Sequence, residues 1–183
     1  MARQIALLRG INVGGHKKVQ MARLRELMER LGYRDVRTYV QSGNVVFTGP
    51  DRPTAEVADE LEGQLAATFG FDVSVVVRSR DELADVVRAN PLREVATEPS
   101  RHLVLFLAGP VDPERIAGLG ADDFEPEAFH VRGREVFLWA PGGVRDSRVA
   151  KALCEQRLGV TATARNWRTV ERLLALADEG PTE

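Results

Sequence analysis

The chain of 183 residues contains a single cysteine, Cys154, and three histidines, and aromatic residues are scarce. One cysteine cannot close a disulfide within the chain, and it excludes a zinc site built from several cysteines. His16, His102 and His130 lack metal-ligand spacing, so we predict no metal site and no cofactor. No apolar run approaches the 18 or so residues of a membrane span, and the N-terminus has no signal-type apolar stretch. We therefore expect a cytoplasmic protein with no membrane partner.

Positive charge is concentrated in the first quarter of the chain. Residues 1–50 hold nine Lys and Arg against three acidic residues, whereas the remainder holds 16 basic and 24 acidic residues. This asymmetry favours an anionic ligand for the N-terminal region. The alternative is that Arg23, Arg25 and Arg30 only solvate the outer face of a helix.

The hydrophobic periodicity predicts the order β-α-β-β-α-β in the first half. Strands are predicted at about 4–9, 35–41, 44–48 and 72–78, and the two helices carry apolar stripes that start at Met21 and Val57. An extra helix begins with a capping box of Ser79 and Glu82 and stops at Asn90-Pro91.

The same order repeats after residue 101. Strands are predicted at about 102–108, 127–132, 134–139 and 160–164, with a helix that begins at Asp112-Pro113 and another over about 146–158. A last helix starts near Trp167. The turn segments at 42–47 and 132–137 share Gly, Val and Phe ninety residues apart. We interpret the chain as a duplication.

The fold class that follows is α+β, a tandem pair of ferredoxin-like βαββαβ halves with extra helices after each. We predict an N-terminal half at 1–90, a linker at 91–101, and a C-terminal half with the terminal helix at 102–183. Several strands are apolar on both faces, so a second face of each sheet needs a cover. Either the other half of the chain or a second copy in a homodimer would provide it.

Two marked segments are expected at the same edge of the first sheet. The first is the glycine-rich connection after the first strand, and the second is the turn after the second strand. The first and second strands of a split βαβ unit are parallel, so their C-terminal ends share an edge. Glycines with adjacent lysines can offer N–H groups and positive charge to a phosphate, although Walker and Rossmann patterns are absent. We predict ligand contacts at Arg9, Gly14, Gly15, Lys17, Gln41, Ser42 and Asn44.

Each of these segments also has a purely structural interpretation. The glycines would then only shape a tight turn, and Ser42 and Asn44 would only form a hairpin. Near the C-terminus, Asn166 would cap a helix, or else Arg165 or Arg168 would complete an anion site from the second half. His16 is the one histidine near the predicted edge, and no catalytic group is assigned.

Three segments carry a family resemblance: Leu-Arg-Gly-Ile-Asn-Val-Gly-Gly at 8–15, residues 21–25, and Tyr-Val-Gln-Ser-Gly-Asn-Val-Val-Phe at 39–47. Through them the sequence resembles a bacterial family catalogued as domain of unknown function 1697. Asn90-Pro91 and residues 163–170 extend the resemblance over the whole length. It implies an α+β fold with ferredoxin-like halves, and it implies no activity, cofactor or catalytic residue.

Four functions fit these patterns, and the first is our choice. It is the binding of a phosphorylated small molecule or nucleotide at the glycine-loop edge. The second is a protein-interaction or dimerisation module without a small ligand. Nucleic-acid binding is disfavoured, since the strands lack the aromatic residues on which bases stack. An enzyme that uses His16 is the fourth, and the sequence does not decide whether a reaction is catalysed.

Overall fold

The computed structural model describes residues 1–180, apart from the side chain of Ala121, and it divides into two compact units. One unit comprises Met1–Asp85 together with the C-terminal segment from Arg172, and the other comprises Val86–Glu171. Each unit contains one four-stranded antiparallel sheet. The predicted segment limits, 1–90, 91–101 and 102–183, stay a prediction.

The first unit has the βαββαβ order that the periodicity predicted. Its sheet has the strand order β2-β3-β1-β4, in which each neighbouring pair is antiparallel. The elements are β1 (Ala2–Leu8), α1 (Met21–Arg30), β2 (Arg34–Tyr39), β3 (Asn44–Gly49), α2 (Thr54–Phe69) and β4 (Val75–Ser79), and α3 (Arg80–Arg88) follows at once.

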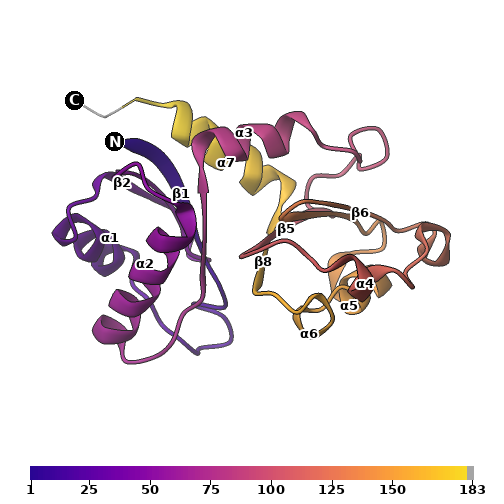
Figure 1. Ribbon diagram of the computed structural model, residues 1–183, viewed down its shortest axis with the longest axis horizontal. Helices are drawn as coiled ribbons and strands as arrows, with labels where there is room; N and C mark the ends of the chain where they lie inside the picture. The colour runs from indigo at the N-terminus through magenta and orange to yellow at the C-terminus, as the bar shows by residue number, and fades with distance from the viewer. Residues whose placement is uncertain (181–183) are drawn as a thin grey trace. The chain divides into compact units, whose positions relative to one another are not determined.

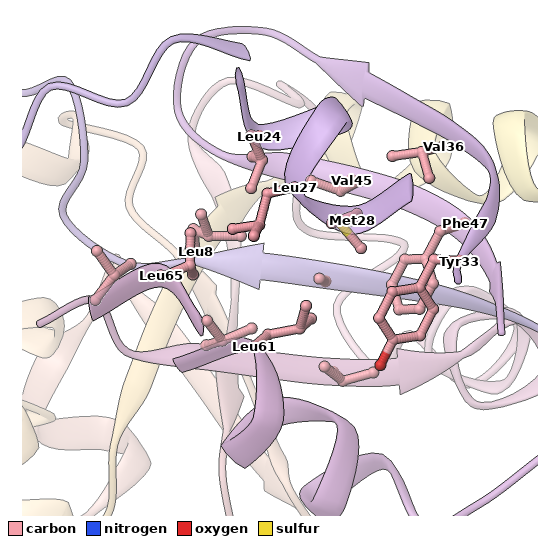
Figure 2. Packing of buried hydrophobic residues seen from close by; sticks show 14 of the residues in the cluster. Leu8, Leu24, Leu27, Met28, Tyr33, Val36, Val45, Phe47, Leu61 and Leu65 are labelled. Carbon is pink, nitrogen blue, oxygen red and sulfur yellow. The ribbon is translucent and has the colours of Figure 1, made fainter. Parts of the chain in front are cut away.

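Helices α1 and α2 cover one face of this sheet (Figure 1). Leucines of both helices meet alternate residues of the central strands in one buried cluster, as Figure 2 shows for Leu24, Leu61 and Leu8. Tyr33 lies edge-on to Phe47, with ring centroids 4.9 Å apart. Each fully buried apolar side chain contributes roughly 1.5–3 kcal/mol, so the packing of this face stabilises the unit.

The opposite face of the first sheet is also buried. Ile5, Val46 and Val76 are at most 2% exposed, although they point away from the α1 and α2 cluster. The end of α7 (Trp167–Asp178) belongs to this unit, and Arg3 donates a hydrogen bond to the Leu176 carbonyl. The prediction that the second face is not left in water is confirmed.

The second unit repeats the fold with shorter helices. Its sheet has the order β6-β7-β5-β8. The elements are β5 (His102–Leu107), α4 (Pro113–Ile116), a 3-10 helix η1 (Ala121–Phe124), β6 (Ala128–Arg132), β7 (Glu135–Trp139), a second 3-10 helix η2 (Val144–Asp146), α5 (Arg148–Ala152), α6 (Glu155–Leu158) and β8 (Ala162–Asn166), with α7 after it.

The continuous helix predicted over about 146–158 is wrong. The structure breaks it between α5 and α6, where Cys154 has extended backbone angles and begins α6. Val149 and Leu153 are four residues apart and share a helix face, but Leu158 follows five residues later and would leave that face. The break lets all three side chains enter the same core cluster.

The residue alignment of the two hairpins is also wrong, by one position. Leu8 donates its amide to the Gly43 carbonyl, and Leu107 donates to the Arg134 carbonyl, so Gly43 matches Arg134 and not Gly133. Phe47 belongs to the core cluster between the sheet and the helices of the first unit. In the corresponding cluster of the second unit lie Val136 and Leu138, and Phe137 is not part of it. Because a shift of one residue moves a strand side chain to the other face, the shared Phe is a coincidence.

The ladder register nevertheless supports the duplication through a different residue type. Arg78 on β4 pairs with Ile5 on β1, and Arg165 on β8 pairs with Val104 on β5. The two arginines therefore occupy matching positions in the two sheets. Both arginines are buried, at 1% and 8% exposed. Each donates from Nη1 to the carbonyl of the residue before it.

Candidate functional site

The two marked segments meet at one edge of the first sheet. The Leu8 amide donates to the Gly43 carbonyl at 2.8 Å, and the Arg9 amide donates to the Ser74 carbonyl at 2.9 Å. The Asn12 side chain then reaches across to the Gln41 carbonyl, with Nδ2 and O 2.8 Å apart. We call residues 9–20 the glycine loop and residues 40–43 the hairpin turn.

Gly43 is required for this meeting. A Cβ atom at this position would lie 2.7 Å from Leu8 Cβ and 2.8 Å from Ile11 Cδ1, and its φ of +87° is unfavourable for other residues. The hairpin turn therefore packs directly on the base of the glycine loop.

Asn12 closes the base of the glycine loop. Its amide donates to the Lys17 carbonyl at 3.1 Å, its Nδ2 donates to the Val19 carbonyl, and its Oδ1 accepts from the Val19 amide. Val13 and His16 face each other across the tip. Four hydrogen bonds to one asparagine, counting that to Gln41, hold the loop in a defined conformation.

The tip of the glycine loop presents backbone N–H groups to solvent. Gly14 and Gly15 are exposed and have φ angles of +58° and +78°. A Cβ on Gly15 would meet nothing within 4 Å. Within residues 1–180, neither amide donates a hydrogen bond to the protein. Such amides are available to an anion.

Positive residues precede and follow the tip in the chain. Arg9, Lys17 and Lys18 are exposed, as is His16. Lys17 Nζ donates to the Asp72 carbonyl at 2.7 Å, which fixes the ammonium group beside the loop without neutralising it. In the described part of the chain no carboxylate contacts His16, so nothing orients it as an acid or base.

The hairpin turn contributes exposed and buried polar groups. Gln41 and Ser42 are exposed, whereas Asn44 is fully buried. Asn44 Nδ2 donates to the Tyr39 carbonyl at 3.0 Å and to Ser42 Oγ at 3.1 Å. Asn44 therefore shapes the turn and positions Ser42.

Strained backbone conformations gather at this edge. Of the four non-glycine residues with positive φ in the described chain, Asn12, Lys17 and Val40 lie here and Asp35 lies in the bulged start of β2. Such conformations cost of order 1–3 kcal/mol each and cluster at functional sites. Asn12 is not among the predicted site residues, although an asparagine in a glycine-rich run favours a left-handed conformation. No sequence signal marks Val40.

A cavity of about 300 Å³ lies next to the glycine loop and is acidic. Its lining includes Asp59, Glu62 and Asp72, and the Asp72 carbonyl is the one that holds Lys17. Glu62 Oε1 already accepts the Val75 amide. In residues 1–180 no group of three or more metal-binding side chains gathers, and no helix combines the length and apolar character needed to cross a bilayer.

The segment around Arg165 has the structural role that the sequence suggested, in which Asn166 caps the last helix. Asn166 Oδ1 accepts the Thr169 amide at 2.9 Å and so caps α7, while Trp167 is buried. Arg165 donates to Thr163 Oγ1 at 2.7 Å, and burial lowers the pKa of its guanidinium to about 10.

Comparison with known proteins shows what this chain is similar to. It matches the structure of the conserved bacterial protein SP0830 from Streptococcus pneumoniae, with 25% identity and a TM-score of 0.75, over 97% of this chain and 99% of that chain. A search of curated proteins found no match. A family model described as protein of unknown function (DUF1697) matches residues 1–137, which include the glycine loop and the hairpin turn. The chain therefore belongs to the DUF1697 family.

Proposed function

We propose that this protein binds the phosphate group of a small phosphorylated molecule or nucleotide at the glycine loop. The amides of Gly14 and Gly15 would bind the phosphate oxygens, and Arg9 and Lys17 would supply positive charge. Gln41 and Ser42 would contact the rest of the ligand from the hairpin turn, and Asn44 would act through Ser42.

The observation that carries this proposal is the comparison between the two units. The second unit makes the same hydrogen bonds at the same edge, from Leu107 to Arg134 and from Ala108 to Thr161, each 2.9 Å long. It connects β5 to α4 through residues 108–112 alone, where the first unit uses residues 9–20 between β1 and α1. The fold therefore does not need the glycine loop.

The hairpin turn is extended as well. Residues 40–43 separate β2 from β3, whereas residues 133–134 separate β6 from β7. Both additions to the first unit thus lie at one edge, and the Asn12–Gln41 hydrogen bond joins them. Two additions that meet, and that carry the strained residues, support a binding role better than a structural one.

The chemistry of the loop favours an anion with several oxygens. Successive backbone N–H groups in a turn, as at Gly14 and Gly15, can form a concave donor surface for phosphate. The hydrogen bonds of Asn12 hold that surface in place before the ligand arrives, which lowers the entropic cost of binding.

The test is a titration with inorganic phosphate, AMP and ADP, followed by ¹⁵N-resolved NMR. We expect the Gly14 and Gly15 amide resonances to shift with a saturable dependence on ligand concentration. The substitution Lys17→Gln should raise the dissociation constant about tenfold, because a charge-assisted contact contributes roughly 1.5–3 kcal/mol.

Lys151→Gln is the matched control, because Lys151 is exposed and lies in the second unit. It removes the same charge and should leave the dissociation constant unchanged. If the glycine amides do not shift with any of the three ligands, the proposal is wrong, and a protein-interaction role gains support.

A further inference from the structure

Two large apolar side chains are exposed beside the proposed phosphate site. Val13, at the tip of the glycine loop, is 65% exposed, and Val40, in the hairpin turn, is 50% exposed. Among the described residues only Met1 and Val95 are other large apolar side chains with comparable exposure. Half of the exposed apolar side chains of this type therefore lie at one edge of one sheet.

Besides exposing an apolar side chain, Val40 has an unfavourable backbone conformation. Its φ is +52°, a left-handed conformation in which a β-branched residue is a genuine outlier. Asparagine or glycine would occupy the same position at lower cost and would expose less apolar surface. Neither folding nor solubility accounts for a valine here.

The two valines flank the contact that joins the two segments. Val13 follows Asn12 in the chain and Val40 precedes Gln41, and the Asn12 Nδ2 and Gln41 O atoms are 2.8 Å apart. Val13 also precedes Gly14, whose amide faces solvent. An apolar surface thus adjoins the donors that would hold a phosphate.

We infer that the ligand of the glycine loop is a phosphate ester whose other part is apolar, and that this part packs on Val13 and Val40. This inference rests on the proposed function, since the loop must bind the phosphate. Removing apolar surface from water on both sides would favour an aryl or alkyl phosphate over a sugar phosphate, whose hydroxyl groups gain nothing from valine.

The test compares a phosphate that carries an apolar ester group with one that carries none, at a pH at which both are dianions. Phenyl phosphate should bind about tenfold more tightly than inorganic phosphate, the ratio expected when roughly 60 Å² of apolar surface leaves water. Val40→Asn and Val13→Ser should each lower this ratio to about threefold, because each valine supplies about half of the contact, and both should leave the dissociation constant for inorganic phosphate unchanged. Val40→Asn should also raise the midpoint of thermal unfolding, because it relieves the backbone strain.

Val95→Ser is the matched control, since Val95 is 51% exposed and lies in the second unit. It should leave the ratio of the two dissociation constants unchanged. Equal affinities for the two probes, or a tenfold ratio that survives both substitutions, would overturn the inference and leave phosphate binding standing. Binding of neither probe would overturn the inference together with the proposed function.

Discussion

His102 shows how one buried residue can tie stability to pH. It is 1% exposed, and its ring stacks on Trp167 with centroids 4.7 Å apart and planes at 11°. Its Nε2 atom is buried without a hydrogen-bond partner in the described chain. Burial lowers the pKa of His102 to about 4, below the value of about 6.5 for an exposed histidine. The folded protein therefore holds this imidazole neutral.

We predict that the free energy of unfolding falls as the pH drops from 6.5 toward 4. In this range the unfolded chain takes up a proton at His102 that the folded chain does not, and the loss between pH 7 and pH 5 should be about 1–2 kcal/mol. Urea unfolding at both pH values measures it. His102→Phe keeps a ring against Trp167 and should reduce the difference. An identical pH dependence in both proteins would show that His102 does not cause it.

At the scale of elements, the glycine loop depends on Asn12 for both its backbone and its hydrogen bonds. The residue has a φ of +55°, and its side chain bonds to Val19 and to Gln41. The two contributions can be separated, because glycine tolerates the backbone angle and alanine does not.

Asn12→Gly should lower the free energy of unfolding by about 1–3 kcal/mol, because three side-chain hydrogen bonds are lost. Asn12→Ala should lower it by about 1 kcal/mol more, since alanine also resists the left-handed conformation. Urea unfolding of the two variants gives both numbers. Equal stabilities of the two variants would contradict the strain that we assign to this position.

The helices show where sequence patterns suffice at this scale and where they do not. The capping box of Ser79 and Glu82 predicted the start of α3, and both of its hydrogen bonds are present. The sequence patterns did not predict the break between α5 and α6. The five-residue spacing from Leu153 to Leu158 does not fit the helical period of 3.6, and this mismatch marks the break. Local hydrogen bonds are encoded locally, whereas a helix break depends on where the core lies.

At the scale of the whole molecule, several arginines of the first quarter make contacts within the first unit. Arg25 donates to Thr38 Oγ1 at 2.7 Å, Arg37 pairs with Glu179 at 2.9 Å, and Arg23 lies over the Phe69 ring. The proposed site at the glycine loop would contact a single phosphate group. A protein that follows a nucleic-acid backbone instead carries basic side chains along a stripe.

We therefore predict a shallow salt dependence for single-stranded oligonucleotides. A 12-nucleotide RNA should bind weakly, with a log–log slope against salt concentration no steeper than about −1, since one phosphate contact contributes about −0.7. Fluorescence anisotropy at several salt concentrations measures the slope. A slope steeper than about −3 would reveal several phosphate contacts and would favour nucleic-acid binding over the proposed function.

The sequence by itself determined the order of the strands, the element order of the first unit, the start of α3 and the meeting of the two marked segments, because periodicity and capping are local and the βαβ topology follows from them. Only the tertiary structure decided how the two hairpins align with each other. The alignment based on the shared Gly, Val and Phe is wrong by one residue. The tertiary structure also decided the strain at Val40 and the burial of Asn44. These features depend on which strand face meets a core and how closely two backbones approach, and such distances arise only when distant parts of the chain pack together.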